Sequence, residues 1–92
     1  MVKINNNSSS SYGSSKYSNM GDFVRGQIQD EIDAYHMYRE WATKAESRGY
    51  DGMARKLREM SDQEQRHGMY LVSFGEDIGV KMNDLDIGRL FE

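Results

Sequence analysis

Apolar residues recur at steps of four and three over residues 20–47, which is the spacing of one face of an α-helix. The stripe consists of Val24, Ile28, Glu31, Tyr35, Tyr38, Ala42 and Ala45, and it is widened by Phe23, Gln27, Ala34 and Trp41. Glu31 is the one acid in it. The flanking Asp30, Asp33, His36, Arg39, Glu40 and Lys44 are predicted to face water. Asn19 is a suitable N-cap, so the helix should begin near residue 20.

The pattern breaks at residues 47–52 and resumes over a second helix, predicted at about 51–75. Gly49 can supply the left-handed residue that ends the first helix, Asp51 can cap the second, and Gly75 lies near its expected end. The second stripe is Met53, Leu57, Met60, Glu64, His67, Leu71, Phe74 and Ile78. A connection this short places two helices side by side and antiparallel. The predicted fold is therefore all-α, with a helical hairpin over residues 19–78.

Composition narrows the possible chemistry. The 92 residues suffice for one small domain, and they include neither cysteine nor proline. Without cysteine there is no disulfide framework, zinc–thiolate site or cysteine-bound iron. A net charge of −3 offers no electrostatic basis for binding nucleic acid or an anionic membrane. We expect neither partner, and no apolar run is long enough to span a bilayer.

Both ends of the chain differ from the hairpin. Residues 1–18 are rich in asparagine and serine, and so polar a stretch predicts a disordered tail. Residues 79–92 form a polar linker followed by a short motif in which apolar residues flank a glycine.

The candidate chemistry lies at Glu64-x-x-His67, where a carboxylate and an imidazole share one face of the second helix. In an antiparallel hairpin that turns near Gly49, the position opposite Glu31 falls between Glu64 and His67. Three ionisable residues thus converge within an apolar stripe, where burying them unpaired is costly. A metal ion explains them best, and a buried polar network that fixes helix register is the alternative.

A lone hairpin cannot cover its own apolar stripes, so we expect a homodimer that forms a four-helix bundle. Two copies of Glu31, Glu64 and His67 then supply four carboxylates and two imidazoles. This is the ligand set of di-iron carboxylate bundles. Oxygen and nitrogen donors of this kind suit iron(II), with manganese as a second possibility.

The same residues resemble the rubrerythrin branch of the ferritin-like superfamily. The resemblance covers about residues 31–68, from Glu31, Ala34, Tyr38 and the run Trp41-Ala42-Thr43-Lys44-Ala45 through Gly49-Tyr50 to Glu64-x-x-His67. It implies that Glu31 and Glu64 are bridging or chelating carboxylate ligands and that His67 is a terminal nitrogen ligand. Tyr38 would lie just outside the ligands, near the carboxylates. The family's usual subunit has four helices, and Gly68 stands where the family favours alanine.

A second resemblance lies at the C-terminus. The run Leu85-Asp86-Ile87-Gly88-Arg89-Leu90-Phe91 looks like the cargo-loading peptide of encapsulin nanocompartments. It implies that Leu85, Ile87 and Leu90 enter grooves of a shell protein, while Gly88 permits the bend between them. Together the two resemblances indicate an encapsulated ferritin-like protein, in which rings of dimers are implied by analogy.

These observations leave three functions open. The first is a ferroxidase with a di-iron site, acting in iron storage or detoxification inside a cytoplasmic encapsulin compartment, with Glu31, Glu64 and His67 as its catalytic residues. The second is a rubrerythrin-like peroxide-reducing protein supplied by an external reductant. The third is a helical interaction module without enzymatic activity.

Overall fold

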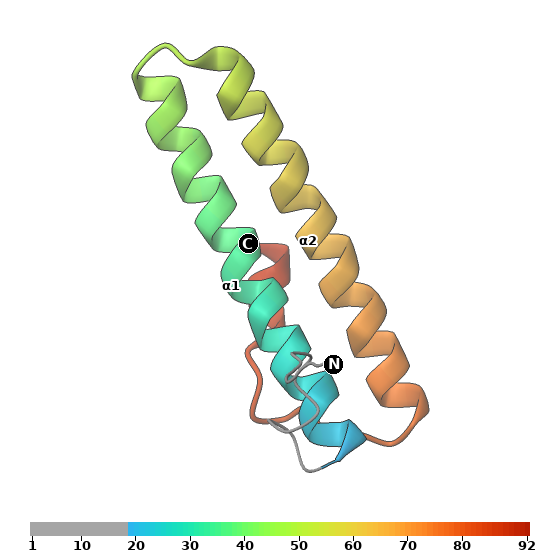
Figure 1. Cartoon of the computed structure of the whole chain (residues 1–92). Coiled ribbons are helices and arrows are strands. Elements are labelled where there is room, and N and C mark those ends of the chain that lie inside the picture. Colours follow the sequence, from blue (N-terminus) through green and yellow to red (C-terminus); the bar gives the residue numbers. More distant parts are fainter. Residues whose placement is uncertain (1–18) are drawn as a thin grey trace, which may run out of the picture.

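The computed structural model describes residues 19–92, and within that range it contains three helices. α1 spans Met20–Ser47, α2 spans Asp51–Asp77 and a short 3-10 helix, η2, spans Ile87–Phe91. α1 and α2 run antiparallel as a long hairpin, and the chain after α2 turns back along it (Figure 1). The predicted all-α hairpin is confirmed. The tail predicted over residues 1–18 lies outside the described residues.

Both helices end in the same way, at a glycine. Gly49 has φ 82° and Gly79 has φ 80°, in the left-handed region that glycine enters without steric cost. The next amide reaches back in each case, from Tyr50 to the Ala45 oxygen (2.9 Å) and from Val80 to the Gly75 oxygen (2.8 Å). These are the bonds that close a helix C-terminus. α2 ends at Asp77, two residues beyond Gly75 and within a turn of the predicted end, and Gly79 supplies the left-handed residue.

The two helix starts differ from each other. The Asn19 side chain accepts a hydrogen bond from the Asp22 amide (2.8 Å), so the predicted cap of α1 is confirmed. α2 instead has Tyr50 at its N-cap position, with no side-chain capping bond. Asp51 was predicted to cap α2, but it is the first residue of the helix. At that position its negative charge interacts favourably with the positive, N-terminal end of the helix dipole.

Small residues form the side of α2 that meets α1. Its buried residues are Ala54, Ser61, Gly68 and Gly75, which recur every seven positions. The Ser61 hydroxyl donates to the main-chain oxygen of Tyr35 (2.9 Å), which joins the two backbones closely. Met53 and Met60, expected in the core, are 58% and 38% exposed in this single chain. The stripe of large apolar residues on α2 therefore lies beside the contact with α1, and the small residues form that contact.

The returning chain completes the core. Leu90 of η2 is fully buried, in a cluster with Val24, Ile28, Ile32 and Tyr35 of α1. Ile32 was absent from the predicted stripe because it is buried by the returning chain, whose position the helical spacing did not predict. None of the helices within residues 19–92 is long and apolar enough to cross a membrane.

Candidate metal centre

Glu31, Glu64 and His67 lie together near the middle of the hairpin. The Nδ1 atom of His67 is 3.3 Å from a carboxylate oxygen of Glu64 and 3.8 Å from one of Glu31. One ligand atom from each residue can be chosen so that all lie within 4.8 Å of one another. α1 contributes Glu31, and one turn of α2 contributes the other two because they are three residues apart. The three ligand atoms are therefore close enough together for one cation to bind between them.

The site lies at the surface of the single chain. The side chains of Glu31 and Glu64 are 19% and 22% exposed, whereas His67 is 57% exposed. The pKa of Glu31 is raised from 4.5 to about 7, mainly by burial and in addition by a hydrogen bond with Glu64 and by the charges of Glu64 and Asp30. Two carboxylates held this close repel each other when both are ionised. A cation between them would remove that repulsion, so the donor set fits a metal ion.

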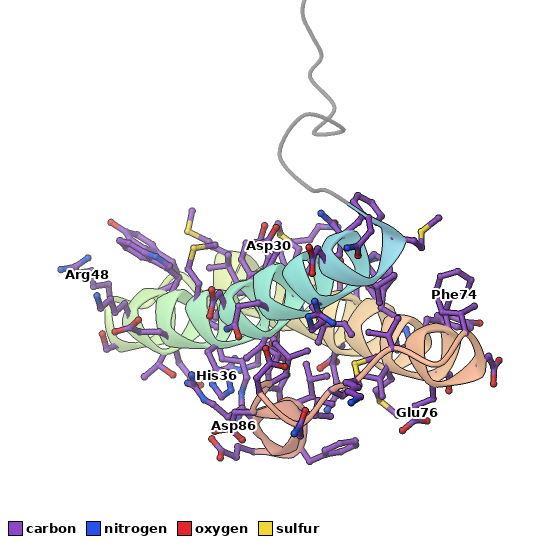
Figure 2. The ribbon with its side chains drawn as sticks, turned by 90° about the horizontal axis from the view of Figure 1, so that it is seen from below. Asp30, His36, Arg48, Phe74, Glu76 and Asp86 are labelled. Carbon is purple, nitrogen blue, oxygen red and sulfur yellow. The ribbon has the colours of Figure 1, made fainter. Side chains whose placement is uncertain are left out.

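Partly exposed apolar side chains of both helices flank this site. By helical spacing, Trp41 and Tyr38 lie on the Glu31 side of α1, and Met60 and Phe74 lie on the His67 side of α2. Trp41, Met60 and Phe74 are between 38% and 50% exposed, while Tyr38 is half-buried. We call this side of the hairpin the open face. Figure 2 shows Phe74 projecting away from the C-terminal end of the chain.

The other side of the hairpin is occupied. His36 was predicted to face water, but it is half-buried and its Nε2 lies 2.8 Å from the main-chain oxygen of Arg89. Because a carbonyl oxygen only accepts, Nε2 must donate. Figure 2 shows His36 between α1 and the segment that carries Asp86. The predicted shell-targeting residues Leu85, Ile87, Gly88 and Leu90 all belong to this side.

The sequence pattern did not identify the residues that hold the returning chain. Gln65 donates to the Leu90 oxygen, Tyr35 to the Glu92 oxygen, and Arg39 donates to both the Tyr35 hydroxyl and the Glu92 oxygen. Polar residues at such positions are common on solvated helix faces, so their types carry no signal. The available signal was Gly68 and Gly75, two glycines one heptad apart inside a helix.

A comparison with known protein families shows which family this chain belongs to. The family model described as Rubrerythrin matches residues 22–88, which include both helices and the three candidate ligands. The chain belongs to the rubrerythrin family. Searches of curated proteins and of solved structures found no match to it.

Rubrerythrins usually bind iron, and di-iron members are typically oxidoreductases. For this rubrerythrin-family chain, Glu31, Glu64 and His67 are the group within residues 19–92 that could hold a metal. A di-iron centre needs more donors than two carboxylates and one imidazole.

Proposed function

We propose that this protein is a ferroxidase whose site forms across a homodimer. The single observation that carries the proposal is the half-complete ligand set on an uncovered apolar face. Glu31, Glu64 and His67 lie within 4.8 Å of one another, and the side chains around them are exposed. A second copy packed on this face by a two-fold axis would bury those side chains and double the set to four carboxylates and two imidazoles.

Iron(II) is the substrate in this proposal. Glu31 and Glu64 bind it, and ionised carboxylates stabilise iron(III) more strongly than iron(II), which favours oxidation. Two iron(II) ions give up one electron each, and the two electrons together with two protons from water reduce dioxygen to hydrogen peroxide, or hydrogen peroxide to two water molecules. His67, as a neutral nitrogen donor, sets the orientation of the site and is itself held beside Glu64 (3.3 Å). The open face would become water-poor on dimerisation, which strengthens the attraction between carboxylates and metal.

Aerobic oxidation of iron(II), followed by absorbance, tests the proposal. Glu64→Ala and Glu31→Ala should each lower the initial rate at least about tenfold, since each removes a charged ligand from both halves of the site. Matched controls are Glu59→Ala on α2 and Glu40→Ala on α1, because both acids are exposed and each pairs with a nearby lysine. Unchanged rates in the Glu31 and Glu64 variants would refute the proposal.

Membership of the rubrerythrin family supports a second candidate, a peroxide-reducing protein. Its electrons would have to come from an external reductant, because the chain has no cysteine to bind an iron module of its own. Rapid iron(II) oxidation by peroxide with slow oxidation by dioxygen would favour this candidate. If iron or manganese changed neither the dimer population nor the melting temperature, the remaining alternative would be an interaction module without enzymatic activity.

We further propose that the protein acts in iron storage or detoxification as cargo of an encapsulin compartment in the cytoplasm. The resemblance of residues 85–91 to a cargo-loading peptide supports this role, with Leu85, Ile87 and Leu90 as the anchoring residues. Dimers would assemble into larger rings. Deleting residues 84–92 should abolish co-purification with the shell while the iron site keeps all its ligands.

A further inference from the structure

The C-terminal segment, defined as residues 85–92, lies in a groove between α1 and α2. Leu90 is fully buried there, and Leu85 and Ile87 are half-buried against the same core. These three residues are the ones proposed above to anchor the segment in grooves of the shell protein. In the structure they are already used by the hairpin, and Phe91 is the one large apolar side chain of the segment that remains exposed, at 64%.

Polar side chains from both helices bind the backbone of this segment. His36 and Arg39 of α1 contact the main-chain oxygens of Arg89 and Glu92, and Gln65 of α2 donates to that of Leu90. Main-chain contacts of this kind fix the position of a peptide and leave its side chains to supply specificity. The groove therefore has the properties of a peptide-binding site that is filled by its own chain.

Two glycines of α2 provide the room for the returning chain. A Cβ atom at Gly68 would lie 2.9 Å from Cδ1 and 3.1 Å from Cδ2 of Leu90, and one at Gly75 would lie 2.0 Å from Cε of Met82. Leu90 cannot move aside easily because it is enclosed by Ile28, Ile32 and Tyr35. Glycine is unfavourable within a helix, and its presence at position 68 is explained by the space that the Leu90 side chain occupies.

We propose that the C-terminal segment is self-docked and that a shell groove must compete with the hairpin for Leu90. This inference rests on the cargo role proposed above and adds its regulation. Only the undocked fraction of the protein can bind, so the apparent affinity falls by that fraction. A segment that is docked nine-tenths of the time would bind about tenfold more weakly than the free peptide. Cargo loading is then set by how firmly the hairpin holds its own end.

Hydrogen exchange on the full chain tests docking without any shell. Gly68→Ala should speed exchange of the Arg89 and Leu90 amides about tenfold or more, because its methyl group presses on a side chain with no room to move. The matched control is Gly52→Ala in the same helix, where a Cβ meets nothing within 4 Å and exchange of the segment should stay within about twofold of the parent. Equal exchange in Gly68→Ala and the parent would overturn the proposal.

A second variant guards against a general packing defect in Gly68→Ala. Gln65→Ala removes the bond to the Leu90 oxygen without adding any volume, and it should also speed exchange of residues 89–92. Both variants should keep the circular-dichroism spectrum of a helical hairpin. Slow exchange of the segment in both would contradict docking through this groove.

Binding to a purified encapsulin shell tests the competition. A labelled synthetic peptide of residues 84–92 should bind more tightly than the full chain, and Gly68→Ala should bind more tightly than the parent although its peptide sequence is unchanged. Equal affinities of parent, Gly68→Ala and peptide would refute the competition. If the peptide itself does not bind, the cargo role fails, and the exchange comparison alone decides whether the segment is self-docked.

Discussion

The two faces of this hairpin are formed by the same two helices, but the C-terminal segment covers only one of them. One face, which includes Ile32, His36 and Gln65, is covered by the chain's own C-terminal segment and buries Leu90 completely. The open face carries Glu31, Glu64 and His67 and leaves its aromatic and methionine side chains partly exposed. The open face is therefore the surface on which we propose that a second copy packs and a metal binds.

The packing of the covered face can be disrupted by substituting Leu90. Leu90→Ala removes a fully buried side chain and should lower the free energy of unfolding by about 3 kcal/mol, measured by chemical denaturation. Phe91→Ala is the control, because Phe91 is 64% exposed and its loss should change stability by less than about 0.5 kcal/mol. Similar losses in the two variants would show that the segment is not seated as described.

The open face can be tested with two methionines of α2 that lie on opposite sides of the helix. Met60 and Met69 are 38% and 45% exposed, so neither substitution should unfold the hairpin. Met60→Glu places a charge on the open face and should weaken dimerisation about thirtyfold, or about 2 kcal/mol, in analytical ultracentrifugation. Met69→Glu lies away from that face and should leave the association unchanged. Equal effects would place the interface elsewhere.

Glu31, on the open face, predicts a pH dependence of stability. The pKa of Glu31 is raised from 4.5 to about 7, mainly by burial. Between these values the unfolded chain loses a proton that the folded chain keeps, so the metal-free protein should lose stability as pH rises from about 4.5 to 7. The loss is on the order of 1 kcal/mol after allowance for solvent screening.

Thermal melts across this pH range should show the slope in the parent, and Glu31→Gln should flatten it. Glu40→Gln is the control and should keep the parent slope. Iron binding requires the ionised carboxylate, so metal affinity should instead rise with pH through about 7. A parent whose stability rises over that range would contradict the described surroundings of Glu31.

A change remote from both faces gives the smallest effect and a baseline. Asn19→Ala removes the cap of α1 and should cost about 1 kcal/mol in chemical denaturation. It should alter neither dimerisation nor the hydrogen exchange of residues 85–92, since the cap lies at the start of α1, about three turns before Glu31. Asn83→Ala, in the exposed loop after α2, is the control and should be neutral.

The helices and the convergence of Glu31 with Glu64 and His67 could be predicted, because both follow from helical spacing and a short turn. The side of α2 that meets α1 could not. Hydropathy patterns weight large residues, whereas the contact is made by a row of small ones at positions 54, 61, 68 and 75. Met60 was therefore expected inside and is partly exposed.

The docking of the C-terminal segment was also beyond the sequence pattern. Apolar residues around Gly88 fit a partner's groove and the chain's own groove equally well. The choice between them depends on contacts made by His36, Arg39 and Gln65, which are distant in sequence. The signal available in the sequence was the pair of glycines at positions 68 and 75, since glycine is unfavourable inside a helix unless a neighbour packs closely against it.

The central claim, that two copies complete one metal site, is tested most directly by native mass spectrometry with and without iron(II) in the absence of oxygen. We expect even-numbered assemblies that take up two iron ions per dimer and a Glu64→Ala protein that takes up none. Monomers that each bind one iron, or dimers that bind none, would contradict it.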